Sequence, residues 1–272
     1  MKILVTGADG MLGQDLCPLL INNGFNVFPA DINNFDITNY SACEKVLKKE
    51  KPDFIIHCAA FTDVEGAEKN LKSAIKINAN GTENIAKLCS ENNITLVYIS
   101  TDYVFDGNKN TPYTTEDSPN PINNYGRTKH QGEEAVKKHC EKYYIIRTSW
   151  LYGKNGKNFV NTMLNLAKEN REIKVVNDQI GSPTWTVELS NGIIEIIKNK
   201  PFGVYHASGE GEVCWYSFAK EIFSIMDLKV NLLPCSSSEY IQLAKRPKYS
   251  VLKNSIKCTS WKESLKKYLL TF

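Results

Sequence analysis

A tyrosine and a lysine four residues apart, Tyr125 and Lys129, could together deliver a proton to a carbonyl oxygen. Side chains at this spacing lie on one face of a helix. A free phenol, with a pKa near ~10, is a poor proton shuttle at neutral pH, but a neighbouring ammonium favours the phenolate and lowers that pKa. Thr101, just past the C-terminal end of a predicted strand, could donate a second hydrogen bond to the same carbonyl. We therefore predict that Tyr125, Lys129 and Thr101 are catalytic.

Spacing alone does not single out this pair, because Tyr-x-x-x-Lys occurs three times in the chain. The other two pairs, Tyr216/Lys220 and Tyr249/Lys253, are interpreted as incidental, since both residue types are common here. Only Tyr125/Lys129 follows a predicted strand end, Ser100–Asp106, and a parallel α/β sheet forms its site at such ends. Position along the chain is therefore the reason for choosing the first pair.

A glycine-rich loop near the N-terminus predicts a site for a dinucleotide. Gly7, Gly10 and Gly13 follow the first predicted strand and open the first predicted helix. They would permit a tight turn, a close approach to a pyrophosphate and close helix–strand packing, in that order. Asp31, which lies 18 residues after Gly13, could accept hydrogen bonds from a ribose and would repel a 2′-phosphate. This pattern favours NAD(H) over NADP(H), with Lys129 near the nicotinamide ribose; the alternative is a plain glycine turn with a surface aspartate.

The segments that carry these residues alternate between short apolar runs and helical periodicity. Buried strands are predicted at Ile3–Val5, Asn26–Phe28, Phe54–Cys58, Leu96–Ile99 and Tyr144–Ile146. Helices are predicted at Leu12–Asn23, Tyr40–Glu50, Leu71–Glu91 and Tyr125–Lys142. Nearly continuous apolar strands suit a parallel sheet that is covered on both faces. The alternation predicts an α/β fold with a doubly wound, Rossmann-like parallel sheet.

The alternation loosens after Trp150, where we place a smaller C-terminal substrate-binding part. Helices are expected there at Phe159–Asn170, Thr186–Lys198, Trp215–Met226 and Trp261–Leu270, with extended pieces at Lys174–Val176 and Gly203–His206. We predict a dinucleotide-binding domain over residues 1–150 and a mainly substrate-binding domain over residues 151–272, with some later segments returning to the first domain. The stretch Pro112–Pro121 is predicted to be an exposed loop before the Tyr125 helix.

The composition argues against several other classes of protein. The 272 residues carry a net charge of +3, with lysines spread along the chain, so no nucleic-acid-binding stripe is indicated. The N-terminal apolar run is too short for a signal peptide, and no segment approaches a transmembrane length. Eight cysteines are scattered without a C-x-x-C pair or a zinc-binding spacing, which is typical of reduced thiols in the cytosol. We expect a cytoplasmic protein without a resident metal.

Several motifs, taken in order, resemble the extended short-chain dehydrogenase/reductase family. Besides the glycine loop and Tyr125/Lys129, they are Asp36-Ile37-Thr38, Cys58-Ala59-Ala60-Phe61-Thr62 and Asn78-Ala79-Asn80-Gly81-Thr82. Within that family the chain is similar to the dTDP-4-dehydrorhamnose reductases. This narrower likeness is carried by Ser100-Thr101-Asp102-Tyr103-Val104-Phe105-Asp106-Gly107, Arg147-Thr148-Ser149-Trp150-Leu151-Tyr152-Gly153, Asp178-Gln179-Ile180-Gly181-Ser182-Pro183-Thr184 and Ala244-Lys245-Arg246-Pro247.

The resemblance implies an NAD(P)H-dependent reductase of a nucleotide sugar. The implied reaction is reduction of the C4 ketone of dTDP-4-dehydro-L-rhamnose, the last step in making dTDP-L-rhamnose for cell-surface polysaccharide. Tyr125 would give the proton, Lys129 would support it and Thr101 would orient the carbonyl. The resemblance places the cofactor against Met11, Leu12, Asp36, Ile37, Ala60, Phe61, Thr62, Asn78 and Ile99. It places the substrate against Thr101, Asp102, Tyr103 and Trp150.

The chain departs from the family pattern at two places. Some members form a dimer around magnesium held by glutamates, and the first matching position here is Asp15, with Glu188 and Glu263 as its candidate partners. The resemblance therefore allows a homodimer and a magnesium ion, but we do not expect the ion. Phe61 stands where other members carry a polar ring, so we expect this cofactor contact to differ.

Two other functions fit the same motifs. One is a different nucleotide-sugar reductase, epimerase or dehydratase of this family; an epimerase would retain its NAD, whereas a reductase consumes free NAD(P)H. The other is a non-catalytic nucleotide-binding regulatory subunit, a type of relative that tends to lose the catalytic tyrosine. The joint presence of Tyr125, Lys129 and Thr101 argues against the regulatory subunit.

Overall fold

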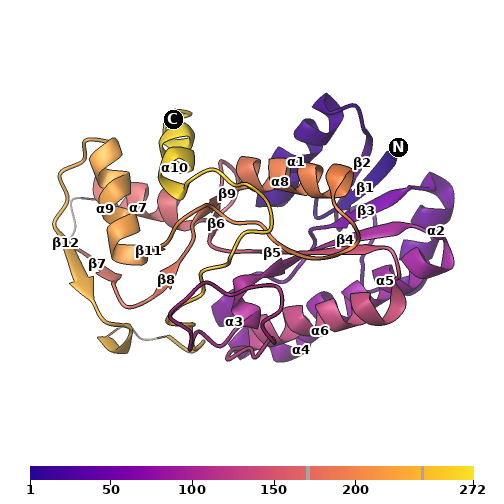
Figure 1. Cartoon of the computed structure of the whole chain (residues 1–272), viewed down its shortest axis with the longest axis horizontal. Helices are drawn as coiled ribbons and strands as arrows, with labels where there is room; N and C mark the ends of the chain where they lie inside the picture. Colours follow the sequence, from indigo (N-terminus) through magenta and orange to yellow (C-terminus); the bar gives the residue numbers. More distant parts are fainter. Residues whose placement is uncertain (170–171, 240–241) are drawn as a thin grey trace.

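The apolar runs of the first half form one parallel sheet, which lies at the centre of the larger part of the molecule (Figure 1). The computed structural model describes residues 1–169, 172–239 and 242–272. The six strands of the sheet, all parallel, are arranged in the order β10-β5-β4-β3-β1-β2. They are β1 (Lys2–Thr6), β2 (Asn26–Ala30), β3 (Phe54–His57), β4 (Thr95–Thr101), β5 (Tyr143–Thr148) and β10 (Gly203–His206). The five strands predicted in the first half are confirmed.

Helices cover both faces of this sheet, which explains why its strands are apolar on both sides. On one face, α1 (Met11–Asn22) and α8 (Thr186–Asn199) pack together over a core that includes Leu16 and Ile193. On the other face, α2 (Tyr40–Glu50), α5 (Thr82–Glu91) and α6 (Asn124–His139) enclose a second core. Figure 1 shows α1 and α8 above the sheet and α6 below it. The predicted doubly wound α/β fold is confirmed.

The predicted helix over Leu71–Glu91 is divided into three pieces. It begins as α4 (Leu71–Ala74), continues as a π-helical segment, η1 (Ile75–Gly81), and ends as α5. Asn78 lies in the π-helical segment, where its side chain accepts a hydrogen bond from Phe61 N (2.7 Å) and donates one to Phe61 O (3.0 Å). Single π-turns of this kind often occur at functional sites. A short helix, α3 (Val64–Lys69), precedes this stretch and was not predicted.

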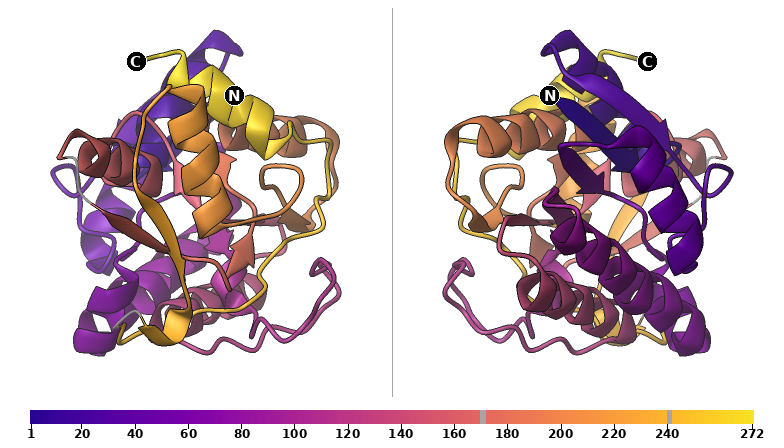
Figure 2. Two further views of the ribbon diagram at one scale, coloured as in Figure 1. Left: turned by 90° about the vertical axis from the view of Figure 1, so that its left-hand side faces the viewer. Right: turned by 90° about the vertical axis from the view of Figure 1, so that its right-hand side faces the viewer.

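The smaller part of the molecule has its own apolar core. Three helices, α7 (Phe159–Lys168), α9 (Trp215–Ile225) and α10 (Trp261–Leu269), pack around this core. Figure 2 shows α9 and α10 at this end of the molecule in its left-hand view. The remaining strands form three two-stranded sheets: β6 (Leu151–Tyr152) with β9 (Thr184–Trp185), β7 (Ile173–Val176) with β12 (Leu232–Cys235), and β8 (Ile180–Gly181) with β11 (Val213–Cys214).

Two elements that follow residue 150 lie in the layers of the main sheet. Strand β10 pairs with β5 from Gly203↔Tyr144 to His206↔Arg147, and α8 packs on α1. The chain therefore passes from the sheet into the smaller part and back again. The division into domains at residue 150, and the assignment of residues 151–272 to substrate binding, stay predictions.

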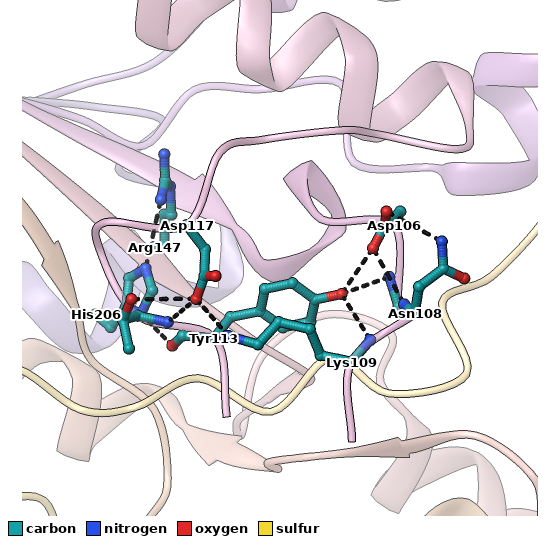
Figure 3. A network of polar contacts seen from close by, with 9 residues as sticks. Asp106, Asn108, Lys109, Tyr113, Asp117, Arg147 and His206 are labelled. Carbon is teal, nitrogen blue, oxygen red and sulfur yellow. Dashed lines mark hydrogen bonds and ion pairs between the residues drawn. The ribbon is translucent and has the colours of Figure 1, made fainter. Parts of the chain in front are cut away.

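The loop that contains Pro112–Pro121 is held to the protein by Tyr113. The Tyr113 side chain is buried and stacks on Phe105 with ring centres 4.2 Å apart. Its hydroxyl donates to Asp106 (2.7 Å) and accepts from Gly107 N (3.0 Å), as Figure 3 shows for Asp106. The prediction of an exposed loop is thus wrong at Tyr113, because an aromatic side chain here gains more from burial than from exposure to water.

Two observations concern the cysteines and the possibility of a membrane-spanning helix. All eight cysteines are free thiols. Over residues 1–169, 172–239 and 242–272, no helix combines the length and the apolarity needed to cross a bilayer.

Candidate active site

A cleft of about 1000 Å³ lies at the carboxyl ends of the parallel strands, where α/β sheets form their sites. Its wall includes Thr6 at the end of β1, Ala30 at the end of β2 and Thr101 at the end of β4. The smaller part of the molecule contributes Lys157 and Trp215. The cleft is therefore bordered by both parts of the chain.

One end of the cleft is shaped to hold a pyrophosphate. Gly7 has a positive φ of 67°, and a Cβ atom at this position would lie 2.7 Å from Ala59 N. Gly10 precedes α1, and no side chain caps the first turn of that helix. Backbone N–H groups at a helix N-terminus, together with the helix dipole, bind anions. The loop thus fits the phosphates of a dinucleotide, as the sequence predicted.

Acidic and apolar side chains stand where the adenosine would lie. Asp31 follows β2, and its carboxylate accepts hydrogen bonds from Asp9 N (3.0 Å) and Ile32 N (2.7 Å). Asp36 accepts from Thr38 N (2.8 Å), and this hydrogen bond lowers the pKa of Asp36. Both carboxylates line the cleft together with Ala30, Phe35 and Ile37. This combination of fixed carboxylates and an apolar wall suits a ribose and a purine.

The predicted acid and its lysine come from the first turns of α6. The Asn123 side chain caps this helix by accepting from Gly126 N (2.7 Å). Lys129 is buried, and its ammonium donates to Ile99 O (2.7 Å) and lies 4.1 Å from the centre of the Tyr98 ring. Tyr125 and Lys129 both line the cleft. The structure therefore brings this pair to the end of β4.

Burial dominates the electrostatics of this pair. It lowers the pKa of Lys129 to about 7, against the carboxylate of Glu133, which favours the ammonium. It also raises the pKa of Tyr125 well above the usual value for a phenol. We expected Lys129 to lower the pKa of Tyr125; the protein alone shows a rise, because burial outweighs the other influences on the phenol. Tyr125 is thus fully protonated at neutral pH.

The end of β4 adds three buried side chains to the cleft. Thr101 Oγ1 donates to Asp102 Oδ1 (3.0 Å) and accepts from Tyr103 N (3.2 Å). Burial raises the pKa of Asp102 to about 7, and its second oxygen, Oδ2, is buried without a hydrogen-bond partner. The Tyr103 ring lies edge-on to Tyr125, with ring centres 6.0 Å apart. Thr101, Asp102, Tyr103 and Tyr125 all line the cleft.

A pair of stacked indoles lines the cleft on the side of the smaller part. Trp150 and Trp215 lie parallel, with ring centres 3.5 Å apart and 4° between their planes. Trp150 adopts a positive φ of 46°, which is rare for a large side chain. Sequence reasoning pointed to Trp150 but missed Trp215, which begins α9. Nothing in the spacing of Trp215 marks it, because it reaches the cleft only through the tertiary fold.

The structure gathers nearly all of the predicted site residues around this one cleft. Two predicted cofactor contacts, Phe61 and Asn78, are not in its lining; they bind each other instead, as described above. Besides Trp215, the sequence missed Lys76, Ser149 and Lys157. The predicted residues in the lining are Gly7, Gly10, Met11, Leu12, Gly13, Asp31, Asp36, Ile37, Ala60, Thr62, Ile99, Thr101, Asp102, Tyr103, Tyr125, Lys129 and Trp150.

The three carboxylates considered for magnesium each have a neighbour of their own. Asp15 accepts a hydrogen bond from the Thr186 hydroxyl. Glu188 accepts from the Thr259 hydroxyl (2.8 Å), and Glu263 pairs with Lys267 (2.9 Å). In the part of the chain that the structure describes, no three His, Cys, Asp or Glu side chains are grouped to hold a metal.

Comparison with known proteins identifies the family. The family model described as the RmlD substrate binding domain matches residues 1–272. The spore coat polysaccharide biosynthesis protein SpsK of Bacillus subtilis is 39% identical, over 98% of this chain and 96% of the relative. A dTDP-4-dehydrorhamnose reductase of Aggregatibacter actinomycetemcomitans is 38% identical, over 92% of this chain and 90% of the relative.

Solved structures agree with this match. A dTDP-4-dehydrorhamnose reductase of Bacillus anthracis in complex with NADP superposes with a TM-score of 0.97 at 44% identity, covering 100% of this chain and 99% of that one. The Clostridium acetobutylicum counterpart gives 0.96 at 45% identity, covering 100% of both chains. The resemblance inferred from the motifs is confirmed, and the chain belongs to the RmlD substrate-binding domain family.

Proposed function

We propose that this chain is a dTDP-4-dehydrorhamnose reductase, which reduces the C4 ketone of dTDP-4-dehydro-L-rhamnose with hydride from NADH or NADPH. The observation that carries the proposal is one cleft that holds the glycine loop at one end and Tyr125, Lys129 and Thr101 at the other. The full-length likeness to reductases of this name supports the substrate.

Each side chain at this end of the cleft has a separate role in the proposed reduction. When bound, the nicotinamide dinucleotide supplies the hydride. Tyr125, protonated because burial raises its pKa, gives its proton to the oxygen of the ketone as negative charge develops there. In the free protein the Thr101 hydroxyl donates to Asp102. With the sugar bound, this hydroxyl turns to donate to the ketone oxygen instead, and the Lys129 ammonium favours the phenolate that remains. Proton transfer by a positioned acid is typically worth ~10²–10⁴ in rate.

Cofactor preference forms a separate part of the proposal. Asp31, with both carboxylate oxygens fixed by backbone N–H groups, would repel a 2′-phosphate and favour NADH. The Bacillus anthracis relative holds NADP, so we propose that NADPH is accepted as well. Titration of the protein with each cofactor measures the preference. Clearly tighter binding of NADPH than of NADH would remove the argument from Asp31.

A second dTDP-sugar is favoured by one comparison. A dTDP-4-keto-6-deoxy-D-glucose reductase of Streptomyces niveus is 37% identical, over 96% of this chain and 90% of the relative. That relative is named for a ketone at the same ring carbon of a different sugar. Parallel assays with dTDP-4-keto-6-deoxy-D-glucose, alone and together with an epimerase that converts it to dTDP-4-dehydro-L-rhamnose, separate the two substrates.

The proposed acid is tested by Tyr125→Phe, which removes one hydroxyl and keeps the ring. We expect cofactor affinity to stay near that of the wild type, and turnover to fall by ~10²–10⁴ because the proton donor is lost. Loss of absorbance at 340 nm with the dTDP-sugar measures turnover; an epimerase that retains its NAD would not consume the cofactor. Near-normal turnover of the variant would show that the acid is another group.

A further inference from the structure

A buried ion pair lies directly behind the proposed catalytic residues. Glu133 follows Lys129 by four residues and Tyr125 by eight on α6, so all three lie near one face of that helix. The Glu133 and Arg147 side chains are 0% and 2% exposed, and Arg147 Nη2 lies 2.7 Å from Glu133 Oε2. A second hydrogen bond from Arg147 Nε to Glu133 Oε1 (2.9 Å) makes the contact bidentate.

The same carboxylate also holds the strand that ends at Thr101. Ser100 Oγ donates to Glu133 Oε1 (2.6 Å), and Ser100 immediately precedes Thr101. One helical turn earlier, Lys129 donates to Ile99 O (2.7 Å), while Tyr98 OH donates to Lys129 O (3.2 Å). Three consecutive residues of β4 are thus tied to α6. These ties fix where Tyr125 and Lys129 stand relative to the Thr101 hydroxyl.

On the far side, Arg147 is held by a neutral histidine. His206 Nδ1 lies 3.1 Å from Tyr113 O and must donate to it, which leaves Nε2 to accept from Arg147 Nη1 (3.5 Å). Figure 3 shows this chain from Arg147 through His206 to Tyr113. Burial lowers the pKa of His206 to about 4, so the ring is neutral at physiological pH. His206 therefore adds no second positive charge beside the Glu133–Arg147 pair.

Stability alone gives a weak reason for such a pair. Burying two ions is costly, and apolar side chains of similar volume often serve as well or better. The location points to a role in the reaction, since the carboxylate also favours the ammonium form of Lys129. Several titratable or charged groups face Lys129 and Glu133. They are His57 at the end of β3, Cys58 after it, Tyr98 on β4, Tyr125 and His130 on α6, Arg147 on β5 and His206 on β10.

We propose that Glu133, clamped by Arg147, is a positioning residue for the reduction: it sets Tyr125 and Lys129 against the end of the strand that carries Thr101. This inference rests on the proposed reductase function. If it is correct, removal of the charge on Glu133 impairs the chemical step and its pH dependence, and leaves binding of the cofactor in the glycine loop unchanged.

The test is Glu133→Gln, with Glu134→Gln as the matched control. Glu134 lies on the same helix, is exposed and pairs with Lys137. For Glu133→Gln we expect kcat to fall about 10²-fold, as a misplaced reacting group can cause, with an unchanged Kd for NADH. The alkaline limb of kcat should move to lower pH, because Lys129 then loses its proton more easily. Glu134→Gln should match the wild type in kcat, in the Kd for NADH and in the pH dependence of kcat.

Each outcome decides the proposal. A folded Glu133→Gln protein with the wild-type kcat and pH profile overturns it. If that variant does not fold, Ser100→Ala decides, because it removes the hydrogen bond between β4 and Glu133 and keeps the charge of Glu133. A lower kcat with an unchanged alkaline limb supports the proposal. A wild-type kcat overturns it. Failure of the wild-type protein to reduce any dTDP-4-keto sugar would instead refute the proposed function.

Discussion

Asp102 shows how a single residue at the site can act against stability. Its carboxylate follows β4 and is almost fully buried. One oxygen accepts a hydrogen bond from Thr101 and the other makes no hydrogen bond, while the nearby Ser250 hydroxyl favours the ionised form but offsets only part of the cost of burial. Burial of an ionised carboxylate without compensation is costly, which is why the pKa of Asp102 rises to about 7. Such groups concentrate at functional sites, and a nucleotide sugar could supply the missing hydrogen-bond donor.

This reasoning predicts that Asp102→Asn stabilises the protein at pH 8. The folded pKa of about 7 lies above the ordinary value, so the stability from the protonated group is present at low pH and is lost as pH rises toward 7. Asparagine carries no charge at any pH. We expect a gain of ~1–3 kcal/mol in the free energy of unfolding at pH 8, and a smaller gain at pH 5. Denaturant unfolding at pH 5 and pH 8 measures the change in the free energy of unfolding. A gain of the same size at both pH values, or a loss of stability at pH 8, contradicts the raised pKa of Asp102.

Some of the other site residues could be predicted from the sequence, and some could not. Gly7 and Tyr125 could be predicted because a local pattern, strand–loop–helix or helical spacing, carries their chemistry. Trp215 could not, because its contact with Trp150 joins positions 65 residues apart and only the tertiary fold creates it. The partnership of Phe61 with Asn78 is likewise a tertiary contact, seen only when the chain is folded.

At the scale of elements, buried strands were easier to predict than interruptions of helices. The apolar runs in β1, β3 and β4 are continuous and buried except at the first residue of β1 and of β3, so they could be located from the sequence alone. The π-helical segment η1 could not, because helical periodicity continues across it. Helix α3, with six residues, is too short to show a period. These elements depend on contacts made after the sheet has formed.

Close packing of α6 against the end of β4 requires glycine at position 126. A Cβ atom there would lie 2.0 Å from Tyr103 O, which is far inside contact distance. Gly126→Ala should therefore push the start of α6 away from the strand end, together with its neighbour Tyr125. We expect a loss of ~1–3 kcal/mol in stability, typical of overpacking, and a fall in kcat beyond that explained by the unfolded fraction.

Thermal melts and turnover measured on the same samples test this prediction. Gln131→Ala is the matched control, since Gln131 is exposed on the same helix and should leave both quantities unchanged. A stable Gly126→Ala protein with normal kcat would show that the helix can move without disturbing Tyr125.

At the scale of the whole molecule, several segments connect the sheet to the smaller part. Strand β10 and helix α8 return to the sheet layers after the chain has entered the smaller part. The segment after residue 242 then crosses back: Asn123 donates to Lys245 O (2.8 Å), and Tyr113 N donates to Val251 O (2.8 Å). Arg246 adds an ion pair to Glu65 of α3 (2.9 Å). Figure 1 shows this segment running along the molecule beside the loop before α6.

These connections predict that the chain unfolds in one cooperative transition. Binding of the cofactor should shift that whole transition to higher temperature. Unfolding of the smaller part would release the chain on both sides of α8 and β10 and would detach the returning segment, so we expect the two parts to unfold together. NADH at about 100 times its Kd should add ~2.7 kcal/mol to the free energy of unfolding, and calorimetry should show one peak whose calorimetric and van't Hoff enthalpies agree. A nucleotide that lacks nicotinamide, such as GTP, provides the control. Two peaks, of which NADH shifts only one, would show that the smaller part unfolds independently and that the connections are weaker than their number suggests.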